Sequence, residues 1–230
     1  MNEVDRLSYS IIPAQASGQV PVINLHNQVY RFWKGIWSET LEKMKLPPLD
    51  LGQILRQDYI CFLTLKNEVI GSHLYSIFDI RKDITIESEY FAQAKNDLIE
   101  YCKLHKVNTL MTQEYLAVHP EWRKTQSGIS LPELIIGLGI KMMQKLGCDS
   151  TVGTIREGAQ SVERISREIK ADLLPCIVSR YNMPHKFFIA RKEIIQLPGN
   201  IKMQELINKL WHEKKDYSHF NDLDKNSIAA

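Results

Sequence analysis

The sequence predicts an α/β (α+β) fold with a single mixed, mostly antiparallel central sheet flanked by helices. Strand-like runs and amphipathic helical patterns alternate along the chain, and no change in composition marks a domain boundary. Two runs rich in β-favouring residues flank Lys66–Glu68, as in a hairpin. An apolar strand, a polar loop and an amphipathic helix follow one another between Leu116 and Gly147. Together these observations indicate helices packed on one sheet.

The first half of the chain begins with a short β-like run and an amphipathic helix whose apolar residues recur at near-helical spacing. The loop LPPLDLG leads from this helix into the hairpin. A helix with one apolar face and an apolar strand come next. The elements expected here are strands 6–13, 59–65, 69–78 and 107–118 and helices 21–45 and 89–105.

The second half continues the alternation. Gly147 suits the C-terminal cap of a helix, and Asn182, Met183 and Pro184 are expected to join two strands. The tail from Lys214 to Ala230 is expected to be loose. The elements expected here are helices 131–146, 159–170 and 201–211 and strands 150–155, 173–181 and 186–195.

Length and composition indicate a globular protein with a substantial core, since 44% of the 230 residues are hydrophobic and 24% are charged. We expect one domain over residues 1–197, followed by a C-terminal helix and flexible tail over 198–230. The net charge is +2, and the basic side chains are scattered instead of clustered. Nucleic acid is therefore not expected as a partner, because a phosphate-binding surface needs clustered Lys and Arg. The sequence leaves the oligomeric state open.

The four cysteines, Cys61, Cys102, Cys148 and Cys176, are far apart, and none belongs to a C-x-x-C pair. We expect unbridged, buried thiols in a reducing compartment and no metal site. The N-terminus lacks the basic start and long apolar core of a secretory signal. No apolar run approaches the ~20 residues that span a bilayer. The expected location is the cytoplasm.

The loop before residue 131 is a candidate anion site. Ser130 and Glu133 fit the S-x-x-E capping box, which predicts that a helix begins at Leu131. Backbone N–H groups of the loop and the positive end of the helix dipole can then point at one anion. The alternative is that Gly128 merely permits a turn and Ser130 merely caps a helix.

The segment Val118-His119-Pro120-Glu121-Trp122-Arg123, followed by the Gly128 loop and a long helix, resembles part of the GCN5-related N-acetyltransferase superfamily. That family often carries V-x-P-E-x-R before an R/Q-x-x-G-x-G/A loop. The order of elements from about Tyr59 to Ile195 is also similar, and the hairpin KNEVIGS looks like the family's second and third strands. The resemblance implies an acyl-CoA N-acyltransferase-like fold and a coenzyme A thioester, acetyl-CoA or a longer acyl-CoA, as co-substrate.

The resemblance also implies binding residues. In that family, the strand before the loop binds the pantetheine arm of coenzyme A through its main chain, and loop amides bind the pyrophosphate. Thr125 at the Arg/Gln position, Ser130 at the last small position and about two extra residues after Arg123 depart from the motif. If these family roles apply to this chain, the residues that bind the pantetheine arm are Leu116 and Val118. Those that bind the pyrophosphate are then Arg123, Lys124, Thr125, Gln126, Ser127, Gly128, Ile129 and Ser130.

Acyl transfer to an amine needs a base, a donor for the developing oxyanion and an acid for the thiolate. Glu114 resembles in position the glutamate that many family members use as the base, and burial in an apolar strand would favour its protonation. It could instead face solvent or pair with a lysine. Tyr115 and His119 are further catalytic candidates, although a histidine at a strand end is often simply exposed.

The acid is unassigned, because the segment 156–170 lacks the tyrosine that many family members place there. Tyr181 is a distant substitute or an ordinary strand aromatic. The aromatic helix residues Tyr30, Phe32, Trp33 and Trp37 either line an acceptor or acyl pocket or pack in the core.

The leading hypothesis is an acyl-CoA-dependent N-acyltransferase in which a small-molecule or peptide amine attacks the thioester directly in a ternary complex. An acyl carrier protein is an alternative donor. The second hypothesis is a catalytically silent module of the same fold that binds an acyl-CoA or a protein partner.

Overall fold

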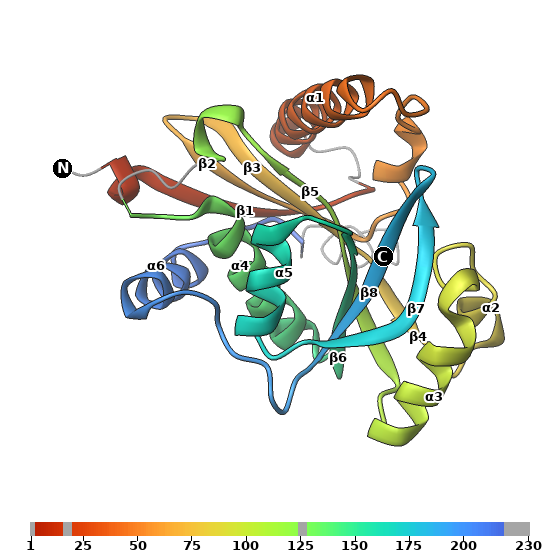
Figure 1. Ribbon diagram of the computed structural model, residues 1–230. Coiled ribbons are helices and arrows are strands. Elements are labelled where there is room, and N and C mark those ends of the chain that lie inside the picture. Colours follow the sequence, from red (N-terminus) through yellow and green to blue (C-terminus); the bar gives the residue numbers. More distant parts are fainter. Residues whose placement is uncertain (1–2, 16–19, 124–127, 219–230) are drawn as a thin grey trace, which may run out of the picture. The chain divides into compact units, whose positions relative to one another are not determined.

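The computed structural model describes residues 3–15, 20–123 and 128–218 (Figure 1). Its strands are β1 (Leu7–Pro13), β2 (Tyr59–Leu65), β3 (Glu68–Tyr75), β4 (Ile77–Asp79), β5 (Thr109–Val118), β6 (Ser150–Arg156), β7 (Asp172–Arg180), β8 (Met183–Arg191) and β9 (Lys215–Asp216). Its α-helices are α1 (Val20–Lys43), α2 (Asp83–Ile86), α3 (Lys95–His105), α4 (Leu131–Leu146), α5 (Gln160–Glu168) and α6 (Ile201–His212).

The strands form one mixed sheet in the order β7-β8-β6-β5-β3-β2-β1-β9, with β4 paired to β5. Parallel pairing joins β5 to β6 and β1 to β9. Antiparallel pairing joins β1 to β2, β2 to β3, β4 to β5, β6 to β8 and β7 to β8. The predicted class, a mostly antiparallel mixed sheet flanked by helices, is therefore confirmed.

The chain divides into two compact units that share strand β5. Unit 1 comprises Met1–Ser76, Tyr115–Ile135 and Glu205–Ala230, and unit 2 comprises Ile77–Glu114 and Ile136–Gln204. Each unit is made of separate segments of the chain. The predicted division instead separates two continuous segments at residue 197. The predicted division into residues 1–197 and 198–230 stays a prediction.

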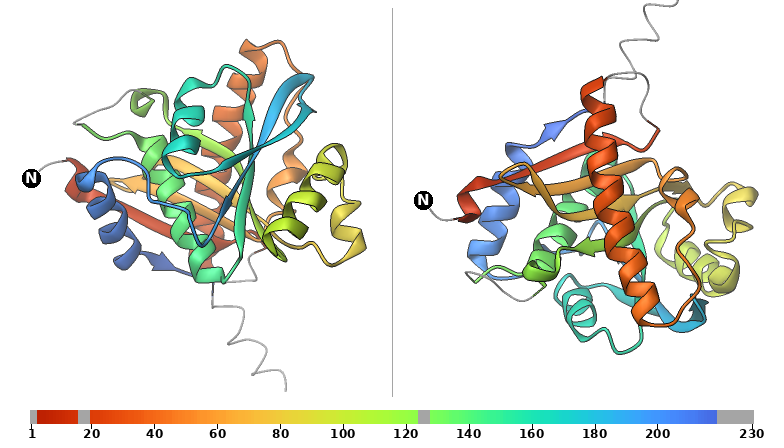
Figure 2. Two further views of the ribbon diagram at one scale, coloured as in Figure 1. Left: turned by 60° about the horizontal axis from the view of Figure 1, so that its bottom comes forward. Right: turned by 90° about the horizontal axis from the view of Figure 1, so that it is seen from above.

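Unit 1 is built on the β1–β2–β3 part of the sheet. Helix α1 lies across one face of these strands, and α6 lies on the other (Figure 2). Trp33 of α1 is fully buried. On the opposite face the rings of Tyr9 and Trp211 pack with centroids 6.2 Å apart. Two covered faces explain why these strands read as nearly continuous apolar runs.

Unit 2 has its own core between α3 and its strands. The cluster is mostly aromatic and aliphatic, and Phe91 and Phe187 are fully buried in it. Helix α3 contributes Leu98 and Cys102. Figure 2 shows α3 and α5 on opposite sides of β6, β7 and β8. The polar helix predicted at 159–170 is therefore a surface element over one face of this unit.

Two differences from the expected elements have local causes. The strand expected over 69–78 is interrupted at Ser76, whose Oγ donates to Gln57 Oε1 at 3.0 Å. The helix expected over 89–105 begins at Lys95, because Tyr90 and Phe91 are buried in the unit 2 core and 92–94 form a 3₁₀ turn.

The turn between β7 and β8 also differs from expectation. Tyr181 and Asn182 both have positive φ, 53° and 57°, as a two-residue type I′ hairpin turn requires. Met183 and Pro184 therefore belong to β8, where Met183 pairs with Arg180. The tail is likewise more ordered than expected as far as residue 216, since β9 pairs with β1.

Candidate functional site

Strand β5 carries two of the three predicted catalytic residues, Glu114 and Tyr115, and His119 follows its last residue. Its parallel ladder with β6 runs from the Leu110–Ser150 pair to the Gln113–Gly153 pair. Glu114 follows directly, and the chain then enters unit 1 at Tyr115. The two parts of the candidate site are described unit by unit.

In unit 2, Glu114 is buried, with 8% of its surface exposed. The hydroxyl of Thr112, which is fully buried, donates to Glu114 Oε1 at 2.9 Å. Residues two apart in a strand share a face, so this hydrogen bond follows from the regular backbone of β5. Glu114 is therefore a buried carboxylate with a fixed orientation, and the alternative that it faces solvent is wrong. Its role as the base stays a prediction.

In unit 1, Tyr115 interrupts the regular strand. Its φ is +52°, the left-handed region, which is uncommon for any residue with a side chain and costs about 1–2 kcal/mol. Two tryptophans of α1 contact it: ring centroids lie 5.6 Å from Trp33 and 5.3 Å from Trp37, both edge-on. Trp37 Nε1 also donates to the Tyr115 carbonyl at 3.3 Å. Aromatic contacts therefore hold the irregular residue in place.

The aromatic helix residues separate into core and partly exposed groups. Trp33 is fully buried, whereas Tyr30, Phe32 and Trp37 are half-buried. Trp33 Nε1 has no hydrogen-bond partner among the described residues. Trp33 is thus a core residue, and the half-buried side chains remain candidates for lining a pocket.

His119 follows the last residue of β5. Its backbone N–H donates to Ile70 O at 2.9 Å, and its carbonyl accepts from Trp122 N at 2.8 Å. The ring is half-buried, and within the described residues Nδ1 is buried without a hydrogen-bond partner. The backbone is therefore fixed while one ring nitrogen can still bind a polar group.

The predicted arm-binding residues lie on the same stretch of β5. Val118 is buried and Leu116 is half-buried. Arg123 is exposed, and its Nε lies 3.4 Å from the carbonyl of Val118, to which it donates. Arg123 thus reaches back to the end of the strand from the 3₁₀ turn at Pro120–Trp122.

The predicted pyrophosphate loop is described in part. Lys124, Thr125, Gln126 and Ser127 lie outside the described residues. Gly128 is exposed with φ of +80°, a conformation that glycine adopts without strain. Ile129 and Ser130 are half-buried.

Helix α4 begins at Leu131 and ends at Leu146, as the capping and glycine signals predict. Leu134 N donates to Ser130 O at 3.1 Å at the first turn. At the other end, Cys148 N donates to Met143 O, and Gly147 has φ of +70°, as in a Schellman cap. The hydrogen bonds of the predicted capping box itself stay a prediction.

Gly71 of β3 positions the first turn of α4 within unit 1. A Cβ at this glycine would lie 2.5 Å from Ile135 Cδ1 and 3.3 Å from Leu131 Cδ2. Absence of a side chain therefore lets the helix start approach β3 closely. The N–H groups at the start of α4 are held close to the sheet by this contact.

Three of the four cysteines carry thiols that are not activated as nucleophiles. None of the four, all within the described residues, forms a disulfide, and three are buried. Burial raises the pKa of the Cys102 thiol to about 12 and that of Cys148 to about 11. Burial also raises the pKa of Cys176. These thiols stay protonated near neutral pH, so they are poor nucleophiles.

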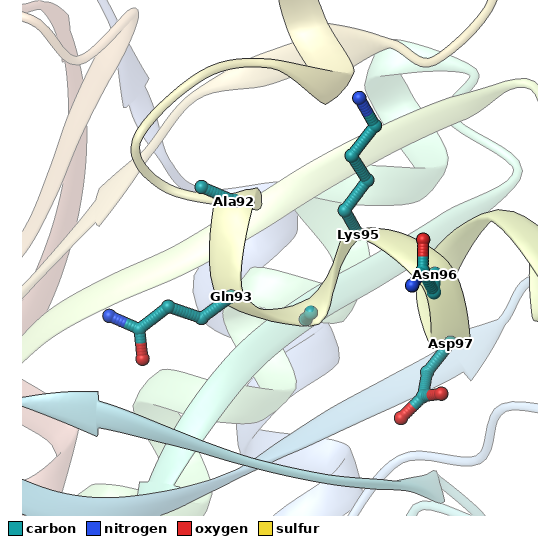
Figure 3. A pocket seen from close by; sticks show the side chains of 6 residues that line it. Ala92, Gln93, Lys95, Asn96 and Asp97 are labelled. Carbon is teal, nitrogen blue, oxygen red and sulfur yellow. The ribbon is translucent and has the colours of Figure 1, made fainter.

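None of the predicted site residues lines the surface hollow in unit 2. It is lined by six consecutive residues, 92–97, at the start of α3 (Figure 3). In Figure 3 the side chains of Gln93 and Lys95 extend in different directions. Gln93 is bonded to the backbone of Ser179, with Ser179 N donating to Gln93 Oε1 at 2.6 Å. The hollow therefore lacks convergent polar groups.

Three other observations bear on the predictions. Tyr181, the distant substitute for the acid, lies in the β7–β8 turn. Among the described residues, no three His, Cys, Asp or Glu side chains gather as metal ligands would. In the same residues, each helix is too short or too polar to cross a bilayer.

Sequence reasoning did not single out Thr112, Gln113 or Thr151. Gln113 is buried, and its Nε2 donates to Thr151 Oγ1 at 2.9 Å. The run Thr112-Gln113-Glu114 inside an otherwise apolar strand was an available signal, because three consecutive polar residues place polar groups on both faces of the sheet.

No family model matches the sequence, and no curated protein matches it either. Several solved structures resemble this fold at low sequence identity. FeeM, an N-acyl amino acid synthase from uncultured soil microbes, is 9% identical, with a TM-score of 0.55 over 82% of this chain and 92% of that one. BjaI, a CoA-dependent acyl-homoserine lactone synthase with SAM and isopentyl-CoA, is 12% identical, with a TM-score of 0.57 over 91% and 93%.

An acyl-CoA N-acyltransferase from Pseudomonas aeruginosa is 8% identical, with a TM-score of 0.52 over 80% of this chain and 99% of that one. These likenesses confirm the fold that the sequence resemblance implied. The chain is a divergent example of the acyl-CoA N-acyltransferase fold.

Proposed function

We propose that this protein is an acyl-CoA-dependent N-acyltransferase that transfers an acetyl or longer acyl group to an amine by direct attack in a ternary complex. The observation that carries the proposal is the buried Glu114, oriented by Thr112, next to the left-handed Tyr115 on β5. The shared fold supports it, since FeeM, BjaI and the Pseudomonas protein are all N-acyl-forming or acyl-CoA enzymes by name.

The residues present fit a coenzyme A thioester. Main-chain groups of Leu116 and Val118 would hold the pantetheine arm, while Arg123 and the loop through Ser130 would hold the pyrophosphate. Gly128 has a left-handed backbone with φ of +80°, and α4 begins three residues later at Leu131, so the first N–H groups of α4 and its positive end would be available to an anion. In unit 1, His119 Nδ1 is a buried polar atom without a hydrogen-bond partner among the described residues, as expected where a polar ligand binds.

When bound, the thioester supplies an acyl carbon with a thiolate leaving group, so that the C–N bond to the amine forms as the C–S bond breaks. Glu114 accepts the proton that the amine loses, directly or through one water. Tyr115 and the strand after it would orient the reacting groups through their backbone. His119 is the second candidate base. No covalent enzyme intermediate is required, in agreement with the protonated cysteines.

The acceptor is proposed to be a small-molecule or peptide amine. FeeM is an N-acyl amino acid synthase and BjaI an acyl-homoserine lactone synthase, so a small polar amine is the first class to test. Because BjaI is described with isopentyl-CoA, the donor panel should extend beyond acetyl-CoA. An acyl carrier protein bearing the same arm belongs in that panel.

A silent binding module is the second candidate. Thr125 and Ser130 depart from the loop motif, and the segment 156–170 contains no tyrosine acid. Such a chain would bind an acyl-CoA as a sensor without turning it over.

Calorimetry with acetyl-CoA and longer acyl-CoA compounds, followed by thiol release against an amine panel, separates these cases. We expect binding in the micromolar range and release that falls about 100-fold or more in Glu114→Gln. Glu100→Gln is the matched control, because Glu100 is an exposed carboxylate of α3. Unchanged release in Glu114→Gln would remove Glu114 from the base role and favour His119. Binding without release supports the silent module, and no binding at high micromolar concentration would contradict both.

A further inference from the structure

The ring of His185, on β8 in unit 2, is oriented by its own strand. Its Nδ1 lies 3.0 Å from the carbonyl oxygen of Met183. A carbonyl oxygen only accepts, so the ring proton is on Nδ1 and is donated to this carbonyl. In the neutral ring Nε2 then carries a lone pair, and Nε2 has no hydrogen-bond partner among the described residues. His185 is therefore held as a base whose accepting atom is Nε2.

His185 lies on the same face of the unit 2 sheet as Glu114. Along β8, His185 is in step with Phe187 and Ile189, which belong to the core cluster of this unit. Along β5, Glu114 is in step with Leu110, which belongs to the same cluster. Both side chains therefore point to the side of the sheet on which α3 packs.

The strand register places the two residues within reach of one small group. The β5–β6 ladder ends one residue before Glu114, which therefore lies beside Thr154 of β6. Thr154 pairs with Phe187, and His185 is two residues away from Phe187 along β8. With strands about 4.8 Å apart and a rise of about 3.3 Å per residue, the Cα atoms of Glu114 and His185 are about 12 Å apart. Two side chains and an amine or water between them can span this distance.

Two arginines on the neighbouring strands keep His185 neutral. Arg156 of β6 pairs with His185, and Arg180 of β7 pairs with Met183 and is its diagonal neighbour. Burial lowers the pKa of His185, and the charges of Arg180 and Arg156 lower it further, against the opposing effect of the hydrogen bond to Met183. The carboxylate on this face is Glu114, at the end of β5. The lone pair on Nε2 is therefore present at neutral pH.

The proposed reaction needs a second proton acceptor. A primary amine with a pKa near that of lysine, about 10.4, is an ammonium group with three N–H bonds at neutral pH. The amide product keeps one of these bonds. One proton must leave before the nitrogen can attack, and another leaves as the C–N bond forms. Glu114 is proposed to take the second proton, so the first needs another base.

We propose that His185 Nε2 accepts the first proton from the ammonium group of the acceptor, directly or through one water. The inference rests on the proposed function and adds a catalytic residue to it. The N–H bond breaks with its electron pair left on nitrogen, and Nε2 then passes the proton to solvent. Arg156 and Arg180 favour this step, because positive charges nearby disfavour an ammonium relative to a neutral amine. The second proton balances the departing thiolate, so the net reaction releases one proton.

The first test reads the protonation of His185 without turnover. Long-range proton–nitrogen NMR of the free protein distinguishes the two ring nitrogens. We expect the proton on Nδ1 and none on Nε2 at pH 7, with protonation of Nε2 only below the ordinary histidine pKa of 6.5. A proton on Nε2 at pH 7 would overturn the proposal, because this atom could then not accept another.

The second test compares amines of similar shape that differ in charge. The probes are the best primary amine of the panel and its analogue fluorinated on the adjacent carbon, for which ethylamine and trifluoroethylamine are the simplest pair. Fluorine withdraws electrons, so the analogue is largely neutral at pH 7. His185→Asn retains an amide N–H that can donate to the Met183 carbonyl but has no counterpart of Nε2. We expect its kcat/KM at pH 7 to fall about 100-fold for the ammonium and less than about 3-fold for the neutral amine.

The matched control is His105→Asn, which removes a half-buried histidine of α3 in the same unit and should change neither rate. Equal falls for both amines in His185→Asn, or no fall in either, would overturn the proposal and leave the proposed function intact. If wild type acylates no amine of the panel, both are overturned. The NMR measurement needs no variant, so a misfolded His185→Asn would not prevent a decision.

Discussion

The two units hold their parts of β5 by different means. In unit 2 the strand is regular, and its polar side chains are bonded in pairs, Thr112 to Glu114 and Gln113 to Thr151. In unit 1 the strand is irregular at Tyr115, which is held between Trp33 and Trp37. We infer that the unit 1 part depends on side-chain volume and on buried neutral groups, and the unit 2 part on individual hydrogen bonds.

The largest expected effect is that of Trp33→Ala in unit 1. Trp33 is fully buried and supports the ring of Tyr115, so its truncation leaves a cavity and should lower the free energy of unfolding by about 3–5 kcal/mol. Denaturant unfolding measures this change. Trp33→Phe fills most of the volume and also removes the unpaired Nε1, so it should lose less than half as much. Equal losses in both variants would contradict a packing role.

The second prediction concerns pH and His73 of β3. His73 is buried, and burial lowers its pKa to about 3, with Tyr75 Oη 3.3 Å from Nδ1. The folded state therefore binds the proton less readily than the unfolded state does. The stability that neutral His73 provides is fully present above about pH 6.5 and is lost as pH falls toward 3.

His73→Leu isolates this contribution. Stability of wild type relative to the variant should fall by at most about 4 kcal/mol between pH 7 and pH 3. Urea unfolding at several pH values measures the difference, in which the carboxylates common to both proteins cancel. A difference that stays constant with pH would show that His73 does not titrate differently on folding.

The third prediction concerns the paired hydrogen bonds of unit 2. Thr112→Val keeps the shape of the side chain but removes the donor to Glu114, and it should destabilise the fold by about 1 kcal/mol. Thr112→Ser retains the hydroxyl and the hydrogen bond but removes a buried methyl group, which should cost about 1 kcal/mol of packing. Thermal unfolding of the three proteins measures both effects. A valine variant as stable as wild type would mean that Glu114 is held by other contacts.

Features that depend on neighbouring residues could be predicted from the sequence, whereas contacts between distant residues could not. The fold class, the order of elements and both ends of α4 depend on local signals, such as Gly147 and the periodicity of apolar residues. The contact of Gln113 with Thr151 joins residues 38 apart, and it depends on the register of two parallel strands. The left-handed Tyr115 had no local signal, because glycine or asparagine normally marks such a position.

The smallest expected effect is at Tyr115. Alanine is usually more stabilising than glycine within a strand, but at Tyr115 we expect the glycine variant to be the more stable of the two. Both variants lose the contacts with Trp33 and Trp37, so their difference reports the backbone alone. At φ of +52° alanine is strained and glycine is not, and Tyr115→Gly should be more stable than Tyr115→Ala by about 1 kcal/mol. At Leu116, where φ is not positive, the alanine variant should be the more stable by about 0.5–1 kcal/mol. Denaturant unfolding of the four variants measures both differences. If alanine is the better residue at both positions, the strand relaxes to an extended backbone once the ring is removed, and the tryptophan contacts are then the cause of the irregularity.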